Sequence, residues 1–387
     1  MRVVDESVVY RNPHPNHRSI VASAPTLAWS RLASEHPFLL CAFRIGQAKM
    51  SPDGRVALRA SRDGGRTWSP LPSPFEALPE PQPSQAGLHL GASAEGTTVL
   101  MASRMWIVEP DSPDWDDDAA GLVHADCLKA DARPGGDWER VTTYDFRRHR
   151  DEWAIPCGPP LSLGGGDWIF PMERHARSYV PEWLRRYHAF AVFSTDDGKT
   201  WAEPTPTLND PEQRVAYYDQ RMAALPDGRI LTVAWVHDVV DDVTLTGRAA
   251  YSDDGGRTWG PPFDTGMLGG PINPIRLRDG RLLATFARRS APRGIRVVLS
   301  EDEGRTWGVD QELVAWDEAT RRTTGTIARS RIGSAGEDEA SLWGTMWGWT
   351  FGTPTAVQLP GGSVALSFFA TGFDGVTEIR CVKIEVE

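Results

Sequence analysis

A nine-residue pattern occurs four times in this chain of 387 residues, and it constrains the fold more than any other feature. The copies are SRDGGRTWS (61–69), STDDGKTWA (194–202), SDDGGRTWG (252–260) and SEDEGRTWG (300–308), which share the form S-x-D-x-G-x-T-W. Aspartate side chains bond the backbone two residues further on, and glycine adopts positive φ, so the pattern predicts a tight turn that its tryptophan can cover. A strand-like run precedes each copy, so each copy is a predicted hairpin turn between two strands.

A second repeat consists of a short polar turn followed by a strongly apolar strand. Clear copies are LPDGRILTVAW (225–235), LRDGRLLATFA (277–287) and LPGGSVALSFF (359–369), with looser copies at 94–101 and 163–170 and a strand at 38–43. Together the repeats predict six four-stranded units, of which the unit around 129–138 and the last unit lack a clear nine-residue pattern. The sequence therefore predicts an all-β fold, a six-bladed β-propeller with four-stranded antiparallel blades. We expect a single domain over residues 1–387, with no open edge if the N-terminal strand completes the last blade.

Composition narrows the classes of partner. The formal net charge of −11 argues against broad binding to nucleic acid or anionic membranes. No run of about 18 apolar residues occurs, and the first residues contain no apolar signal core, so we expect a cytoplasmic protein without a membrane partner. The four cysteines form no C-x-x-C pattern, which favours buried free thiols, and we expect no cofactor and no metal site. An acidic loop at 108–118 offers oxygen ligands for calcium, but a solvated loop is the stronger interpretation.

The two repeats resemble those of the sialidase (neuraminidase) superfamily, whose six-bladed propellers carry S-x-D-x-G-x-T-W turns called Asp boxes. The resemblance covers nearly the whole chain. It implies that the boxes serve structure and that the active site lies on the other face. That face is built from the starts of the inner strands and the loops between second and third strands. It further implies an exo-acting glycoside hydrolase for a terminal, acidic sugar, with an arginine triad, a Tyr–Glu nucleophile pair and an Asp acid/base.

The segments that would form this face are rich in arginine although the protein is acidic. Guanidinium groups bind carboxylates through two parallel hydrogen bonds, which suits an acidic sugar, although loop arginines also pair with nearby acids. The candidates for substrate binding are Arg18, Arg174, Arg221 and Arg288. Arg18 stands nearest to the R-I-P motif that opens the first blade in the family. Asp53 occupies the place of the family's acid/base, although S-P-D-G is also an ordinary hairpin turn.

The chain departs from the family at three places. Gln220 stands where the resemblance implies a glutamate, and a glutamine cannot act as a base. No arginine occurs near Trp235, where the second member of the triad would fall, and Trp349-Thr-Phe-Gly stands in place of the nucleophilic tyrosine. The sequence is therefore similar to a divergent branch of the superfamily.

The stretch YYDQR (217–221) is the strongest candidate for chemistry. We expect Asp219 to perform proton or nucleophilic chemistry and Arg221 to bind substrate beside it. Alternation along a strand places Asp219 and Arg221 on one face, and Tyr218 and Gln220 on the other. The competing interpretation is that Asp219 and Arg221 simply bond each other or neighbouring blades.

Further candidates lie in equivalent segments of other units. The catalytic candidates are Asp219, Asp53, Glu173, His237 and Tyr218, and the binding candidates besides the arginines are Gln220, His89 and Trp349. The His237 imidazole, with an unperturbed pKa of about 6.5, suits proton transfer, and the aromatic face of Trp349 can stack on a sugar ring. The prediction is a sialidase-like glycosidase with a carbohydrate substrate. The alternative is a non-catalytic propeller that binds carbohydrate or protein. The sequence leaves the sugar, the linkage and the oligomeric state open.

Overall fold

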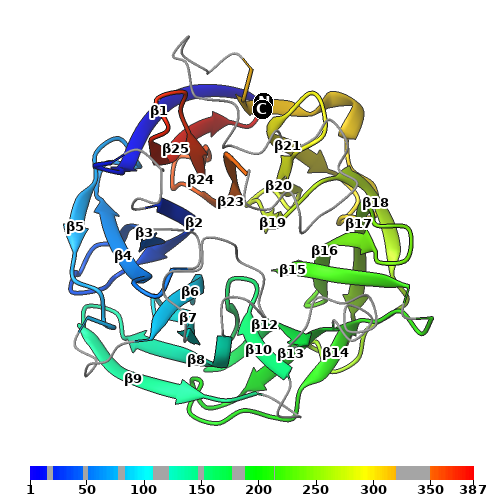
Figure 1. Ribbon diagram of the computed structural model, residues 1–387, viewed down its shortest axis with the longest axis horizontal. Helices are drawn as coiled ribbons and strands as arrows, with labels where there is room; N and C mark the ends of the chain where they lie inside the picture. Colours follow the sequence, from blue (N-terminus) through cyan, green and yellow to red (C-terminus); the bar gives the residue numbers. More distant parts are fainter. Residues whose placement is uncertain are drawn as a thin grey trace.

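The computed structural model describes residues 1–14, 21–46, 51–76, 83–107, 122–146, 152–176, 188–212, 214–319 and 349–387. Arg18, the acidic loop at 108–118 and most of the segment between the fifth and sixth units lie outside these ranges. The described strands form six antiparallel sheets arranged around a central axis (Figure 1). The predicted all-β, six-bladed propeller is thus confirmed.

Each blade runs from an inner strand at the axis to an outer strand at the rim. The first blade contains β2 (Val21–Ser30), β3 (Phe38–Gly46), β4 (Arg55–Ser61) and β5 (Ser69–Leu71), and the second β6 (Ser84–Ala92), β7 (Thr98–Ile107), β8 (Leu122–Ala132) and β9 (Trp138–Tyr144). The third contains β10 (Glu152–Pro156), β11 (Leu161–Gly164), β12 (Asp167–Ala176), β13 (His188–Ser194) and β14 (Thr205–Leu208). Its inner strand is divided, since β10 and β11 both pair with β12.

The remaining blades follow the same order. The fourth contains β15 (Val215–Ala224), β16 (Ile230–Asp238), β17 (Val243–Ser252) and β18 (Phe263–Leu268). The fifth contains β19 (Ile272–Arg276), β20 (Leu282–Arg288), β21 (Gly294–Ser300) and β22 (Leu313–Asp317), with the 3-10 helix η1 (Val309–Gln311) before β22. The sixth contains β23 (Phe351–Gln358), β24 (Val364–Thr371), β25 (Thr377–Glu385) and β1 (Arg2–Arg11).

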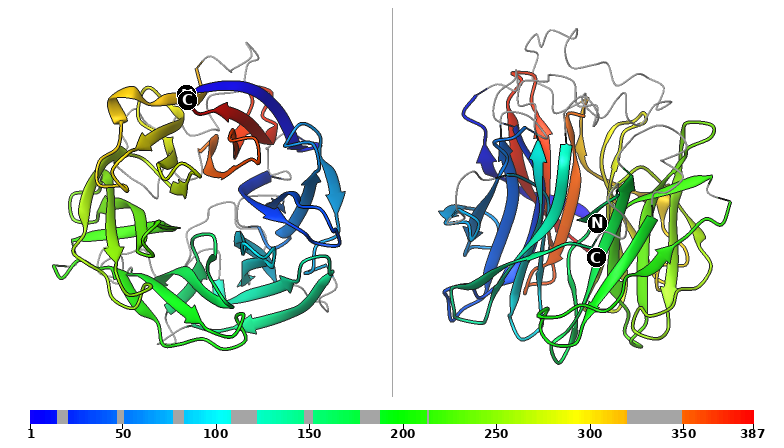
Figure 2. Two further views of the ribbon diagram at one scale, coloured as in Figure 1. Left: turned by 180° about the vertical axis from the view of Figure 1, so that it is seen from behind. Right: turned by 60° about the horizontal axis from the view of Figure 1, so that its bottom comes forward.

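The ring closes through β1, the first strand of the chain. It pairs antiparallel with β25, from Arg2 opposite Glu385 to Arg11 opposite Glu378. The two chain ends consequently lie side by side in both views of Figure 2. This pairing covers an edge of the sixth sheet that would otherwise be exposed, so the N-terminal strand does complete the last blade.

The Asp boxes form the predicted turns between third and outer strands. In the fourth blade, Asp254 accepts hydrogen bonds from the Thr258 backbone N–H (2.8 Å), the Thr258 hydroxyl (2.6 Å) and the Ser252 hydroxyl (2.9 Å). A side chain on Gly256, whose φ is +88°, would come within 2.7 Å of Ile169 in the preceding blade. Each box is therefore both a local turn and a contact between neighbouring blades.

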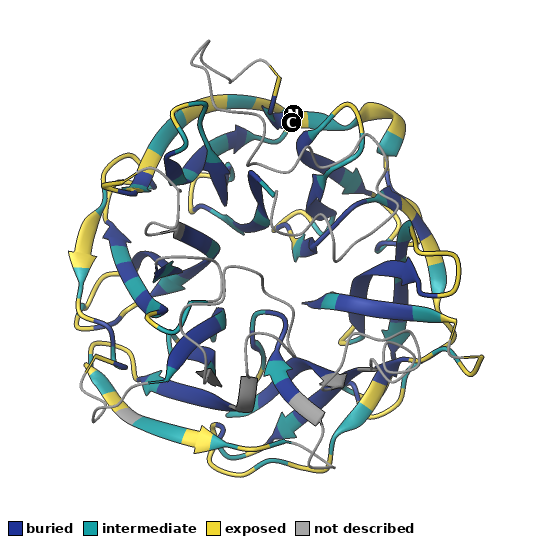
Figure 3. Ribbon diagram, viewed as in Figure 1, coloured by how far each residue is buried: buried dark blue, intermediate teal, exposed yellow. Residues whose placement is uncertain are grey.

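Burial follows the radial position of each strand. Strands near the axis and in the middle of the blades are buried, whereas the outer strands carry most of the exposed positions (Figure 3). Every residue of β16 is buried, because this strand packs against neighbouring blades on both faces. The apolar clusters accordingly bridge neighbouring blades, one joining the first to the second and another the fifth to the sixth.

The second blade lacks a clear Asp box, and a buried ion pair lies at its contact with the Asp box of the third blade. The Lys129 side chain is 1% exposed, and its ammonium group pairs with both carboxylate oxygens of Asp131. The same ammonium lies 3.4 Å from the Asp197 carbonyl oxygen, which belongs to the Asp box of the third blade. Lys129 therefore connects the second blade to the next box.

Candidate functional site

Four inner strands contain a β-bulge near the end at which the inner strands begin, hereafter the mouth. The register slips within β2, β6, β15 and β23, and each slip contains a residue with positive φ. These residues are Ala24 (51°), Gly87 (48°), Asp219 (49°) and Thr353 (45°). Such a conformation costs free energy for residues other than glycine, so the surrounding structure must hold it. The main catalytic candidate, Asp219, is thus the bulged residue of the fourth blade.

Three contacts fix Asp219 in this bulge. Its backbone N–H donates to Glu173 Oε2 at 2.8 Å, across the boundary between the third and fourth blades. Its Oδ2 accepts a hydrogen bond from the Trp235 indole N–H at 3.1 Å. Its Oδ1 lies 3.9 Å from Arg221 Nη2, and the Asp219 side chain is 32% exposed whereas that of Arg221 is 2% exposed. A carboxylate accessible to solvent is therefore held beside a buried guanidinium.

Because of the bulge, the side chains of β15 do not alternate as expected from the sequence. Tyr218 packs with Trp235 and Trp349, whereas the Gln220 amide N–H groups donate to the Met172 and Phe190 carbonyl oxygens of the third blade. Tyr218 and Gln220 thus lie on opposite faces, because the extra residue at 219 shifts the alternation by one. Gln220 is 0% exposed, and its side-chain oxygen accepts hydrogen bonds from two threonine hydroxyls.

Arg221, His89 and Cys157 form a buried group beside Asp219. Within the described residues, Arg221 Nε and Nη1 and His89 Nδ1 have no hydrogen-bond partner. Burial and the charge of Arg221 hold the pKa of His89 well below its usual value, so its imidazole is neutral. Burial, together with the charge of Glu173, raises the pKa of the Cys157 thiol well above its usual value. Arg221 thus supplies the positive charge of this group, and two of its nitrogens have no acceptor within the described residues.

Gly158 allows the third blade to approach this group closely. A Cβ atom at this position would lie 2.3 Å from the Gln220 carbonyl oxygen and 3.3 Å from Arg221 Cδ. The segment between β10 and β11 can therefore pass against β15 only with glycine at 158. The segment that divides the inner strand of the third blade thus packs against Arg221.

An aromatic group adjoins Asp219 on the other side. The Trp235 ring lies 5.1 Å from that of Tyr218 and 6.2 Å from that of Trp349, measured between centroids. The Arg289 guanidinium lies 3.6 Å from the Trp349 ring centroid and donates to the Gly270 carbonyl oxygen. Trp349 is half-buried, so part of its surface is accessible.

Four other candidates lie away from this cluster. Asp53 is exposed in a turn closed by the Gly54 N–H and the Ser51 carbonyl oxygen, at the mouth of the first blade, which lies across the axis from the fourth (Figure 1). His237 is buried and bonds Asp242 at 2.9 Å, and burial lowers its pKa. Arg174 and Arg288 contact protein groups: Arg174 lies over the Phe190 ring, and Arg288 lies 3.2 Å from Glu312.

The structure therefore brings together one subset of the predicted residues. Asp219, Tyr218, Arg221, Glu173, His89 and Trp349 converge, and Arg18 lies outside the described residues. The site candidates selected from the sequence did not include Trp235, Arg289 or Cys157, which belong to this group. Arg289 directly follows the predicted Arg288, and only the packing of Trp349 distinguishes the two. Within the described residues there is no cluster of metal-binding side chains and no helix long and apolar enough to span a membrane.

No protein-family model and no curated protein sequence matches the chain. Among solved structures, a protein of unknown function from Dyadobacter fermentans DSM 18053 is similar at a TM-score of 0.73 and 20% identity, over 100% of this chain and 99% of that one. A Hadza microbial sialidase gives a TM-score of 0.62 and 14% identity, over 94% of this chain and 66% of that one. The α-L-arabinanase of Penicillium chrysogenum complexed with arabinobiose gives a TM-score of 0.60 and 11% identity, over 100% of this chain and 99% of that one. At such identities the likeness establishes the fold alone, a fold that this chain shares with glycosidases.

Proposed function

We propose that this protein is a glycoside hydrolase that removes a terminal sugar and that Asp219 is its reacting carboxylate. The observation that carries the proposal is the arrangement around Asp219. Its solvent-accessible carboxylate stands beside the buried Arg221, and the Glu173 carboxylate binds its backbone N–H across the blade boundary. The fold shared with sialidases and an arabinanase supports the same class of chemistry.

The contacts of Asp219 suit it to act as an ionised carboxylate. The Trp235 indole N–H and the Arg221 guanidinium both stabilise negative charge on it. In hydrolysis, such a group either attacks the anomeric carbon or accepts a proton from the water that attacks it. In both cases the glycosidic C–O bond breaks, and a proton must reach the departing oxygen from a second group.

Glu173 and Asp53 are the two carboxylates considered for that second role. Asp53 is exposed at the mouth of the opposite blade, as described above. Glu173 is 5% exposed and already binds the Asp219 N–H, so its first role is to hold the bulge.

The equivalent residue of the first blade, Arg44, supports this structural role for Glu173. The two positions are equivalent because each lies five residues after a residue that pairs with the serine of an Asp box, Leu39 in the first blade and Trp168 in the third. Arg44 likewise reaches across to the next inner strand, donating to the Gln85 carbonyl oxygen at 3.0 Å.

The neighbours of Asp219 favour an acidic or acceptor-rich sugar. Arg221 retains N–H donors without acceptors in the described residues, and burying such donors costs free energy unless a ligand satisfies them. A carboxylate or a ring hydroxyl would accept these hydrogen bonds. Neutral His89 beside Arg221 adds a nitrogen that can donate or accept, and Trp349 offers an apolar surface for a sugar ring.

The proposal is tested with aryl glycosides of sialic acid, uronic acids and arabinofuranose. Removal of a general acid or base costs roughly 10²–10⁴-fold, so Asp219→Asn should abolish most of the turnover. Asp253→Asn is the matched control, because Asp253 is an exposed residue of the same blade in the Asp box at the opposite end. Turnover that survives Asp219→Asn would refute the assignment. Absence of turnover on every donor would favour the non-catalytic carbohydrate- or protein-binding propeller.

Two substitutions separate the roles of Glu173. Glu173→Gln keeps an oxygen that can accept the Asp219 N–H but cannot transfer a proton, whereas Glu173→Ala removes both functions. If Glu173 only holds the bulge, Glu173→Gln keeps most of the activity and Glu173→Ala loses it. Equal losses in both variants would make Glu173 the second reacting carboxylate, and Asp53→Asn would then leave turnover unchanged.

A further inference from the structure

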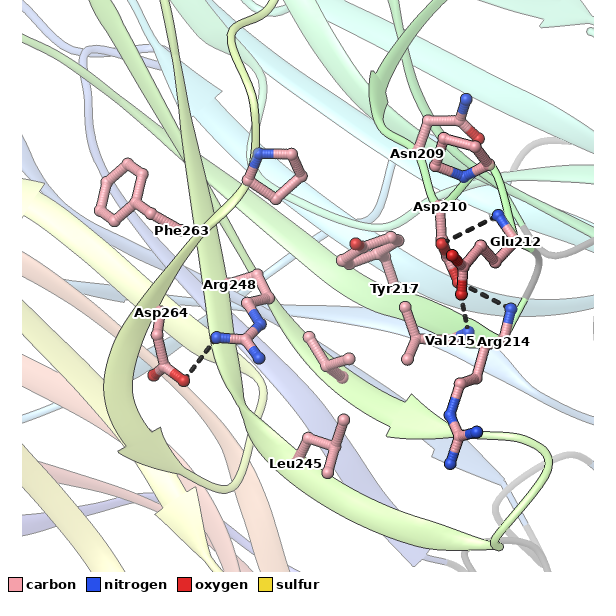
Figure 4. Close-up of a pocket in the computed structure, with 13 residues that line it drawn as sticks. Asn209, Asp210, Glu212, Arg214, Val215, Tyr217, Leu245, Arg248, Phe263 and Asp264 are labelled. Carbon is pink, nitrogen blue, oxygen red and sulfur yellow. Dashed lines mark hydrogen bonds and ion pairs between the residues drawn. The ribbon is translucent and has the colours of Figure 1, made fainter.

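A cleft of about 540 Å³ opens in the fourth blade beside β15 (Figure 4). Its lining does not include Asp219, Arg221 or Trp235. One side is formed by residues 209–212 and 214–215, which lead into β15. The other side is formed by β17 and residues 262–264 at the start of β18. Nothing in the candidate site accounts for this cleft.

Part of the cleft wall is apolar, and a tyrosine side chain stands among these apolar residues. Leu245, Val236, Pro262 and Phe263 line it, together with Tyr217. Tyr217 is 6% exposed, and its hydroxyl makes no hydrogen bond within the described residues. Figure 4 shows this side chain between the Arg248 side and the Asp210 side of the cleft. This hydroxyl is therefore available to bond a ligand in the cleft.

Most of the charged groups at the rim have partners, and the exposed Glu212 carboxylate makes no hydrogen bond or ion pair within the described residues. Asp210 accepts hydrogen bonds from the backbone N–H groups of Glu212, Arg214 and Val215. Arg248 pairs with Asp264 through one nitrogen, and its other nitrogens make no hydrogen bond within the described residues. The cleft lining contains three carboxylates against two guanidinium groups, so it has no excess of positive charge to attract an acidic ligand. The groups available to hydrogen-bond a ligand are the N–H groups of Arg248, the Tyr217 hydroxyl and the Glu212 carboxylate, which lie beside the apolar part of the wall.

We infer that this cleft is a second binding site, specific for a neutral saccharide unit. A sugar ring presents hydroxyl groups that accept hydrogen bonds from Arg248 and Tyr217, and C–H faces that pack against Phe263 and Leu245. Asp219 does not line the cleft, so an occupant here is bound and not cleaved. Binding at this site is independent of the turnover assigned to Asp219.

Calorimetric titration with arabinotriose and maltotriose tests the inference, with 3′-sialyllactose as the acidic probe. Tyr217→Phe removes only the hydroxyl and should weaken binding of a neutral trisaccharide about three- to tenfold, the value of one hydrogen bond. Leu245→Trp places a large ring in the cleft and should abolish binding. Asp219→Asn should leave this affinity unchanged.

Tyr251→Phe is the matched control, because Tyr251 stacks on Phe263 in the same blade but does not line the cleft. It should bind as the wild type does. Three results would overturn the inference: no binding of either neutral trisaccharide, binding insensitive to Tyr217→Phe and Leu245→Trp, or tighter binding of 3′-sialyllactose in a Tyr217-dependent manner. None of these results bears on the Asp219 turnover assay, so the two proposals can fail separately.

Discussion

The buried ion pair of the second blade predicts an asymmetry between two substitutions. Lys129 is 1% exposed, whereas the Asp131 side chain is 24% exposed. Asp131→Asn removes the carboxylate that pairs directly with this buried ammonium group, and breaking a buried ion pair in this way costs about 3–5 kcal/mol of unfolding free energy. Lys129→Met leaves the Asp131 carboxylate, which is partly exposed and can turn towards solvent. We therefore expect Lys129→Met to cost less unfolding free energy than Asp131→Asn.

The same reasoning gives the sign of a pH effect. Burial lowers the pKa of Lys129 in the folded protein, and an unfolded lysine titrates near about 10.4. Between these two values the unfolded state binds the proton and the folded state does not, so stability rises with pH. Without Asp131 the folded pKa falls further and this window widens. The deficit of Asp131→Asn should therefore shrink as the pH rises from about 7 to about 9.5.

Urea unfolding followed by tryptophan fluorescence measures both effects. The midpoint should be lowest for Asp131→Asn, and the double variant Lys129→Met/Asp131→Asn should recover most of the loss because no unpaired charge remains. The reasoning is refuted if Lys129→Met destabilises as much as Asp131→Asn, or if the Asp131→Asn deficit is the same at both pH values.

Three further predictions concern the mouth and the boxes. Gly158→Ala should lower both the melting temperature and the turnover, because its Cβ would lie 2.3 Å from the Gln220 carbonyl oxygen; wild-type values in both assays would contradict the close approach. Burial lowers the pKa values of His89 and His237 in the folded protein, so the unfolded state binds protons at a higher pH than the folded state does. The free energy of unfolding should therefore fall as the pH drops below about 6.5, by up to about 1.4 kcal/mol per pH unit for each histidine. Urea midpoints between about pH 7 and 5 check this, and a flat profile would count against it. Hydrogen bonds from Thr258 lower the pKa of Asp254 to about 2, and Asp254→Asn should cost about 1 kcal/mol at neutral pH in the same urea assay, since the site is exposed.

The number of blades and the closure of the ring could be predicted from the sequence. The Asp box is a local structure: Ser252, Asp254 and Thr258 satisfy one another within a few residues, so the pattern alone specifies the turn. The apolar strands that follow the second repeat are hydrophobic throughout because they are buried on both faces, as β16 is. Local hydrogen bonding and burial of this kind are visible in one sequence.

The candidate site could be predicted only in part. The polar residues of YYDQR marked β15 as unusual, and Asp219 and Arg221 do lie close together. The bulge at 219 has no local signal, since it depends on Glu173, which is 46 residues away and in another blade. Its consequence, the separation of Tyr218 from Gln220, contradicts the simple alternation expected of a strand.

The sequence by itself determined the architecture of this protein, because its repeats are stabilised by contacts within each turn and strand. Only the tertiary structure decided which side chains meet at the mouth. Arg288 and Arg289 are neighbours in the chain, yet one pairs with Glu312 and the other stacks on Trp349. One of these contacts lies within the fifth blade and the other reaches Trp349, which precedes the sixth, and both join segments that are distant along the chain.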